Sequence, residues 1–74
     1  MTREEFKVAF SENLKTLRNK RHLTQKALGM LCGFDENLAE RGVQRWEYCE
    51  SIPPTEKLRA LATALKCTID ELIP

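Results

Sequence analysis

The sequence predicts an all-α fold class, a compact bundle of five helices in a single domain over residues 1–74. Apolar residues recur every three or four positions, which is the spacing of an amphipathic helix. No segment shows the sustained alternation of apolar and polar residues that predicts a strand. Helix start and stop signals divide the chain into five segments of helical length.

The first expected helix follows Thr2 and ends near Lys20. The segment from Thr2 to Glu5 has the composition of a capping box, in which a threonine hydroxyl and a glutamate carboxylate each accept a backbone N–H. Four apolar residues then recur at helical spacing and are expected to form one buried face: Phe6, Phe10, Leu14 and Leu17.

The second expected helix begins after Thr24, whose hydroxyl can cap the first free N–H groups. Leu23 before the cap and Leu28 inside the helix are placed for a hydrophobic staple. Gly33 is expected to end this helix because glycine adopts the left-handed conformation at little cost.

The starts of the last two expected helices are marked by prolines and by a threonine. Pro53 and Pro54 prevent helix continuation, and one apolar face then marks a fourth helix: Leu58, Leu61, Ala62 and Leu65. The segment from Thr68 to Glu71 is a second capping box, which opens a short final helix.

Composition limits the classes of function. A chain of 74 residues offers little room for both a core and an enclosed catalytic cavity, so an enzyme is not expected. The three cysteines contain no Cys-x-x-Cys pair, and the only histidine, His22, has no matching ligand spacing. We therefore expect reduced, structural thiols, no metal, no cofactor, no small-molecule substrate and no membrane span, with the protein in the cytoplasm.

The third expected helix, from about Arg41 to Tyr48, has two chemically different sides. Val43, Trp46 and Glu47 fall on the side expected to face the core. The opposite arc of about 100° carries groups that can pair with base edges or phosphates: Arg41, Gln44, Arg45 and Tyr48. This helix predicts either a DNA-reading face or an ordinary solvated face.

The ordered set of motifs resembles the phage-repressor and Cro type of helix-turn-helix regulator, a lambda-repressor-like DNA-binding domain also called the XRE family. The resemblance covers about residues 14–73. Its elements are Leu17-Arg18, Leu23-Thr24-Gln25, Leu28, Gly33, Val43, Trp46-Glu47, Pro53, Leu58, the run from Leu61 to Leu65, and Ile69 to Ile73. The resemblance implies a transcriptional regulator, repressor-like in action, that binds double-stranded DNA operators as a homodimer.

The resemblance also implies roles for single residues. It places Gln25 where the family's glutamine meets a phosphate and supports the recognition helix. It places Arg41, Gln44 and Arg45 at reading positions. Lys26 is a further candidate for phosphate contact, although an exposed helix lysine is equally expected there.

Two further assignments are structural. Arg18 and Glu47 match a family pair that joins the first helix to the end of the recognition helix, and a guanidinium and carboxylate withdrawn from water need each other. Thr24 is expected to act as a helix cap and not as a DNA contact.

The turn before the recognition helix is longer than the family pattern. Val43 lies ten positions after Gly33 instead of about six, so four extra residues occupy the segment 35–42. We expect an added helical turn that begins at Asp35. The chain then either breaks near Gly42 or continues as one longer helix, and the sequence leaves both alternatives open.

Other departures affect the surroundings of the motif. Leu38 is expected to pack against Leu31 and Phe34. Gly29 stands where the family prefers alanine, and Cys49 replaces a customary glycine. Glu50 and Ser51 replace residues that are often basic in the family, and Glu36 and Glu40 would repel a DNA backbone that they faced.

The last helix and the net charge bear on assembly and on alternative functions. The short last helix is expected to leave apolar surface for dimerisation: Ile69, Leu72 and Ile73. The near-neutral net charge of +1 also favours a protein–protein interaction module built on the same bundle. Single-strand stacking on Trp46 and Tyr48 is disfavoured because Trp46 falls on the core side.

Overall fold

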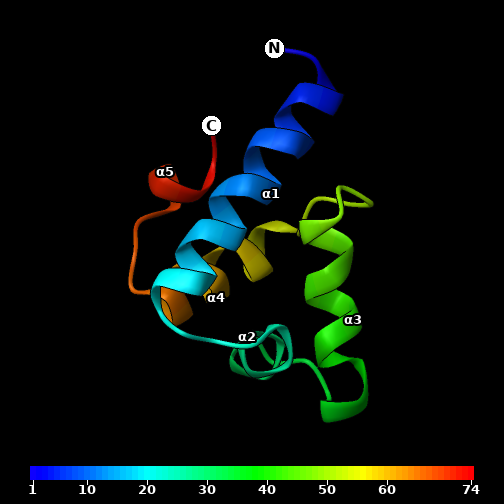
Figure 1. Cartoon of the computed structure of the whole chain (residues 1–74), viewed down its shortest axis with the longest axis vertical. Helices are drawn as coiled ribbons and strands as arrows, with labels where there is room; N and C mark the ends of the chain where they lie inside the picture. Colours follow the sequence, from blue (N-terminus) through cyan, green and yellow to red (C-terminus); the bar gives the residue numbers. More distant parts are fainter.

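The structure is a computed structural model that describes all residues from 1 to 74. It contains five helices: α1 (Arg3–Lys20), α2 (Gln25–Leu31), α3 (Glu36–Glu47), α4 (Thr55–Leu65) and α5 (Ile69–Leu72). The predicted all-α class is confirmed. Figure 1 shows α2 and the start of α3 at one end of the molecule, while both chain termini lie at the other end. None of the helices combines the length and apolar character needed to cross a membrane.

The predicted helix caps are present. The Thr2 hydroxyl accepts a hydrogen bond from the Glu5 amide at 3.1 Å, and the Glu5 carboxylate accepts one from the Thr2 amide at 2.9 Å. The Thr2 amide, and to a smaller extent the Thr2 hydroxyl, stabilise the Glu5 carboxylate and hold its pKa below the usual value. The Thr24 and Thr68 hydroxyls accept the Ala27 and Glu71 amides and so cap α2 and α5, but the carboxylate bond that would complete the box predicted at Thr68 is absent.

One core joins all five helices. Its largest buried side chains come from every helix: Phe10, Leu14, Leu28, Val43, Trp46, Leu61, Leu65 and Leu72. Phe6 and Leu17, which the helical spacing also assigned to the buried face of α1, lie half-buried at its edge. Cys32 is a free thiol inside this core, and burial raises its pKa.

Helix α3 has the longer of the two forms that the sequence left open. It starts at Glu36, five residues before the expected Arg41, and runs without a break through Gly42 to Glu47. Asp35 caps this earlier start by accepting the Asn37 amide at 3.0 Å. The structure therefore has the longer helix and not the break near Gly42.

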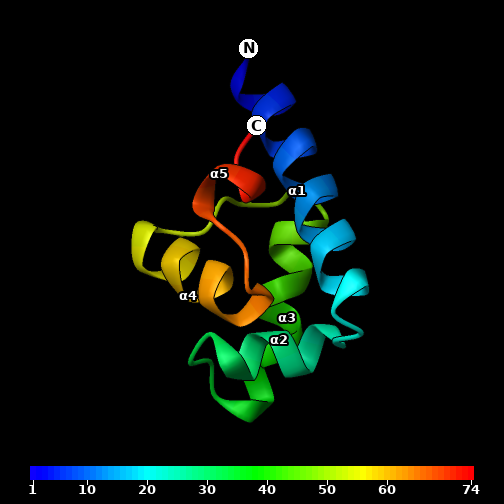
Figure 2. The same cartoon turned by 90° about the vertical axis from the view of Figure 1, so that its left-hand side faces the viewer.

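The added turn of α3 packs closely on α2, and this contact explains Gly29. A Cβ atom at position 29 would lie 2.3 Å from the carbonyl oxygen of Ala39, which is itself fully buried. The family alanine would therefore meet the backbone of the added turn. Figure 2 shows α2 and α3 crossing at this end of the bundle.

The expected burial of Leu38 is wrong. Leu38 is 60% exposed and Leu31 is 59% exposed. Phe34 instead turns its ring toward Gly42, where a Cβ atom would lie 2.7 Å from the ring, and toward Trp46, at 5.5 Å between ring centroids. Leu38 lies on the outer side of α3 beside Arg41 and Arg45, so its side chain stays at the surface.

Left-handed residues follow α2 and α3. Gly33 has a φ of +92° just after α2, as predicted for the end of that helix. Cys49 has a φ of +63° after α3, where the chain reverses direction. This left-handed conformation is higher in energy for cysteine than for glycine because cysteine has a Cβ atom. The Cys49 Sγ lies 3.2 Å from the Ser11 Oγ of α1, which ties the reversal to the first helix.

Candidate nucleic-acid interface

The outer face of α3 carries the side chains expected to read DNA. Arg41, Arg45 and Tyr48 are exposed, and Tyr48 keeps 59% of its surface accessible. Gln44 is half-buried. The opposite side of the helix is core, with Val43 and Trp46 buried. A helix buried on one side in this way presents its outer guanidinium groups from a fixed position.

A buried ion pair holds the end of α3 against α1. Arg18 donates through Nε to Glu47 Oε2 at 2.6 Å and through Nη2 to Glu47 Oε1 at 3.1 Å. Its third nitrogen, Nη1, donates to the Leu23 carbonyl at 2.8 Å. Glu47 is only 2% exposed. This bidentate geometry satisfies a carboxylate that has lost its contact with water.

Gln25 extends this network to α2. Its Nε2 donates to Glu47 Oε1 at 3.1 Å, and its Oε1 accepts from Gln44 Nε2 at 3.3 Å. Gln44 also donates to Glu40 Oε1 at 3.1 Å. The side chains of Gln25 and Gln44 are thus turned toward each other, between α2 and α3, and both already have partners inside the protein.

Two of the basic side chains expected to contact DNA form ion pairs with acidic residues of the protein. Lys26 Nζ lies 3.3 Å from Glu36, and Arg41 lies 3.4 Å from Glu50. All four side chains are substantially exposed, so each pair contributes about 0–1 kcal/mol and exchanges easily for another partner. Arg45 forms no ion pair in the structure.

The three residues expected to form a dimer contact differ in burial. Leu72 is fully buried, whereas Ile69 and Ile73 are half-buried. The reason is that α5 packs on both α1 and α4, and Asn13 of α1 anchors it by donating to the Leu72 carbonyl at 2.9 Å. The assignment of Leu72 to a dimer contact is therefore corrected: its side chain completes the core of the monomer.

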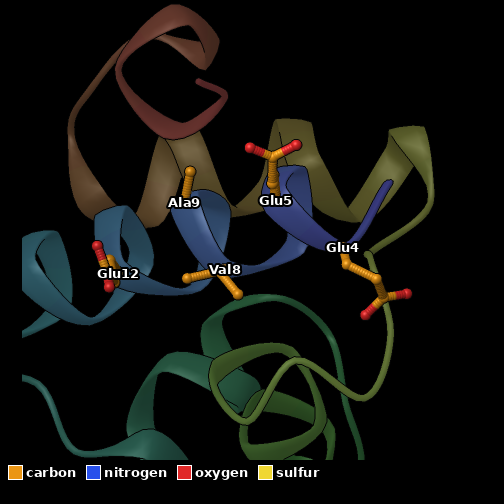
Figure 3. Close-up of a pocket in the computed structure, with 5 residues that line it drawn as sticks. All are labelled: Glu4, Glu5, Val8, Ala9 and Glu12. Atoms are coloured by element: carbon orange, nitrogen blue, oxygen red, sulfur yellow. The ribbon is translucent and has the colours of Figure 1, made fainter. Parts of the chain in front are cut away.

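The hollow on the first half of α1 is shallow and has no convergent polar groups. Figure 3 shows Glu5 and Ala9 pointing to one side of the helix and Glu4 and Val8 to the other. Together with Glu12, these side chains surround a curved helix surface and not a cavity. A small-molecule site normally needs a concave pocket with a few polar groups aimed at one point, and this surface lacks that arrangement.

Sequence reasoning missed two exposed residues of α3, Asn37 and Leu38. The added turn from Asp35 was predicted, but only the segment from Arg41 onward was considered for DNA contacts. The signal that could have found both residues is their helical spacing from Arg41, which puts Asn37 and Leu38 on the outer side of a continuous helix.

Comparison with known proteins agrees with this geometry. A family model described as helix-turn-helix matches residues 14–72, which leaves out only the first part of α1 and the last two residues. No curated protein and no solved structure matches the chain. The match covers most of the sequence and includes α2, the turn and α3. The chain belongs to the helix-turn-helix family of the phage-repressor and Cro (XRE) type, a family of DNA-binding regulators.

Proposed function

We propose that this protein is a sequence-specific transcriptional regulator that inserts α3 into the major groove of double-stranded DNA and acts as a repressor by occupying its operator. The observation that carries the proposal is the pair of exposed arginines, Arg41 and Arg45, on a helix held rigidly from behind by the network of Arg18, Glu47 and Gln25. A preorganised helix with guanidinium groups on its outer face suits bidentate pairing with guanine.

The proposed roles differ from residue to residue. Arg45, which has no ion-pair partner to lose, reads a base edge. Arg41 does so after exchanging Glu50 for DNA. Tyr48 and Lys26 meet phosphates, where they contribute affinity and not sequence preference. Gln25 positions α3 through its bonds to Glu47 and Gln44, and Gln44 reaches a base only by leaving Gln25.

Substitution of Arg45 by alanine tests the reading face. Loss of a bidentate guanine contact is expected to weaken binding to the preferred duplex by about 1–3 kcal/mol and to relax preference at one base pair. Gln25→Ala is expected to weaken binding to all duplexes similarly because it loosens the position of α3. Fluorescence anisotropy with preferred and scrambled duplexes measures both effects.

Arg59→Ala is the matched control, because Arg59 is an exposed arginine on α4 and not on α3. It is expected to leave sequence preference unchanged. Each titration is repeated at several salt concentrations. Binding should weaken as salt increases, with a modest slope, because few basic residues can reach phosphates. Equal losses on preferred and scrambled duplexes for Arg45→Ala and Gln25→Ala, or binding independent of salt, would contradict the assignment.

We further propose that two copies bind a two-fold operator, with a contact that includes the half-buried Ile69 and Ile73. Two recognition helices would then lie about 34 Å apart, one turn of DNA. Ile73→Glu is expected to reduce dimer formation on a palindromic duplex in sedimentation experiments, while a single half-site is still bound. A strict monomer for the unmodified protein, with and without the palindrome, would rule out the dimer and leave the reading face untouched.

A second candidate function is a protein-interaction module. The exposed apolar side chains of Met30, Leu31 and Leu38 favour it, since large apolar groups at a surface often mark a contact with another protein. The anisotropy experiment separates the two functions: an interaction module would bind neither duplex above the background of a protein without DNA affinity.

A further inference from the structure

We infer that the added turn at the start of α3 is itself a reading element, in which Asn37 contacts a base edge and Leu38 contacts a thymine methyl group. This inference rests on the proposed function and extends it to two residues outside the expected reading positions. It depends on three properties of the turn: its rigidity, the direction of its exposed side chains and their chemistry.

The added turn is held firmly at its base. The Asp35 side chain caps it through the Asn37 amide. Ala39 is fully buried, and its backbone lies so close to Gly29 that no Cβ atom fits between them. A turn anchored in this way can present side chains to a ligand without a large loss of conformational entropy.

The exposed side chains of the turn point in the same direction as the expected reading residues. At about 100° per residue, Asn37, Leu38, Arg41 and Arg45 fall within an arc of about 100°. Leu38, Arg41 and Arg45 line one surface hollow, together with Phe34 and Gly42. The extra residues therefore lengthen the arginine face by one helical turn, toward the amino-terminal end that such helices direct at base edges.

The carboxylates of this turn have partners within the protein. Glu36 is paired with Lys26 of α2, and Glu40 accepts a hydrogen bond from Gln44, which in turn contacts Gln25 of α2. Both acids are thus engaged on the side of α3 that borders α2.

The chemistry of the two side chains fits the major groove. An asparagine amide can donate to adenine N7 and accept from adenine N6–H, and no side-chain hydrogen bond occupies Asn37 within the protein. In the free protein the apolar side chain of Leu38 is exposed to water, which is unfavourable. In the major groove an apolar side chain can pack on the thymine C5-methyl group. The guanidinium groups beside Leu38 favour DNA over an apolar protein surface as its partner.

Helix geometry also predicts the spacing of the contacts. Asn37 and Arg41 are four residues apart, about 6 Å along the helix axis. Successive bases on one strand are about 3.4 Å apart. The base contacted by Asn37 is therefore expected about two positions from the guanine contacted by Arg41.

Selection of bound duplexes from a random pool tests the inference. The unmodified protein, Asn37→Ala and Leu38→Ala are compared with Asn19→Ala and Met30→Ala, which remove an exposed asparagine and an exposed apolar side chain outside α3. Asn37→Ala is expected to lose preference for one adenine by about tenfold. The two control variants are expected to select the same motif as the unmodified protein.

The thymine contact has a more direct measurement. Replacing the critical thymine by uracil removes only the methyl group, and it is expected to weaken binding of the unmodified protein about fourfold, the factor for one buried carbon. Leu38→Ala is expected to bind the thymine and uracil duplexes equally. Because Asn37 and Leu38 are exposed, the melting temperatures of both variants should match that of the unmodified protein.

Several outcomes would overturn the inference. If the unmodified protein selects a motif and both variants select it with the same preferences, the added turn does not read DNA. If Leu38→Ala changes only the oligomeric state, Leu38 contacts protein instead. If the unmodified protein selects no motif at all, the proposed function fails together with the inference.

Discussion

Replacement of Glu47 by alanine is expected to lower the free energy of unfolding by about 3–5 kcal/mol. The substitution removes the acceptor for two nitrogens of Arg18 and for the amide of Gln25 while leaving the guanidinium largely withdrawn from water. The loss is large for a chain of 74 residues, whose total stability is expected to be about 4–11 kcal/mol. Chemical denaturation followed by circular dichroism measures it.

Two controls isolate the ion pair. Glu50→Ala removes an exposed carboxylate that lies 3.4 Å from Arg41, and it is expected to cost about 0–1 kcal/mol. The double variant Arg18→Met with Glu47→Met removes both charges and is expected to be more stable than Glu47→Ala, because neither charge remains buried alone. Equal denaturation midpoints for Glu47→Ala and Glu50→Ala would show that the pair does not hold α3 in place.

Replacement of Leu72 by alanine is expected to cost about 2–5 kcal/mol. Leu72 is fully buried where α5 meets α1 and α4, so the shorter side chain leaves a cavity and loses apolar contacts. The same denaturation experiment measures the loss. This expectation replaces the role in dimer formation that the sequence suggested for the residue.

Leu38→Ala provides the matched control, because it makes the same chemical change at a leucine that is 60% exposed. It is expected to change stability by less than about 0.5 kcal/mol. A similar loss of stability for both variants would mean that α5 does not contribute to the core. A loss of stability that depends on protein concentration and occurs only for Leu72→Ala would support a dimer contact at Leu72.

The ion pairs around α3 differ in burial, and this difference matters for DNA binding. Arg18 and Glu47, behind the helix, form a short and buried ion pair, whereas the pairs of Arg41 with Glu50 and of Lys26 with Glu36 are longer and exposed. Exposed ion pairs exchange partners at little cost, and buried ones do not. The helix can therefore keep its position while its outer face changes partners from protein carboxylates to DNA.

Much of the fold followed from local chemistry in the sequence. The capping box at Thr2, the caps at Thr24 and Thr68 and the glycine after α2 define helix boundaries through interactions between residues at most a few positions apart. Such interactions depend little on the rest of the molecule, so they can be recognised from sequence. The inward side of α3 was also predictable, because helical periodicity alone separates Val43 and Trp46 from the arginines.

Only the tertiary structure decided the length of α3, the position of Leu38 and the role of Leu72. Asp35 and Gly42 were compatible with both a broken and a continuous helix, and the choice depended on Phe34 filling the space beside Gly42. Leu38 and Leu72 are the same residue type in helices, yet one is exposed and the other fully buried. Burial depends on which neighbouring helix occupies the space beside a side chain, and those neighbours come from distant parts of the chain, which a local pattern does not specify.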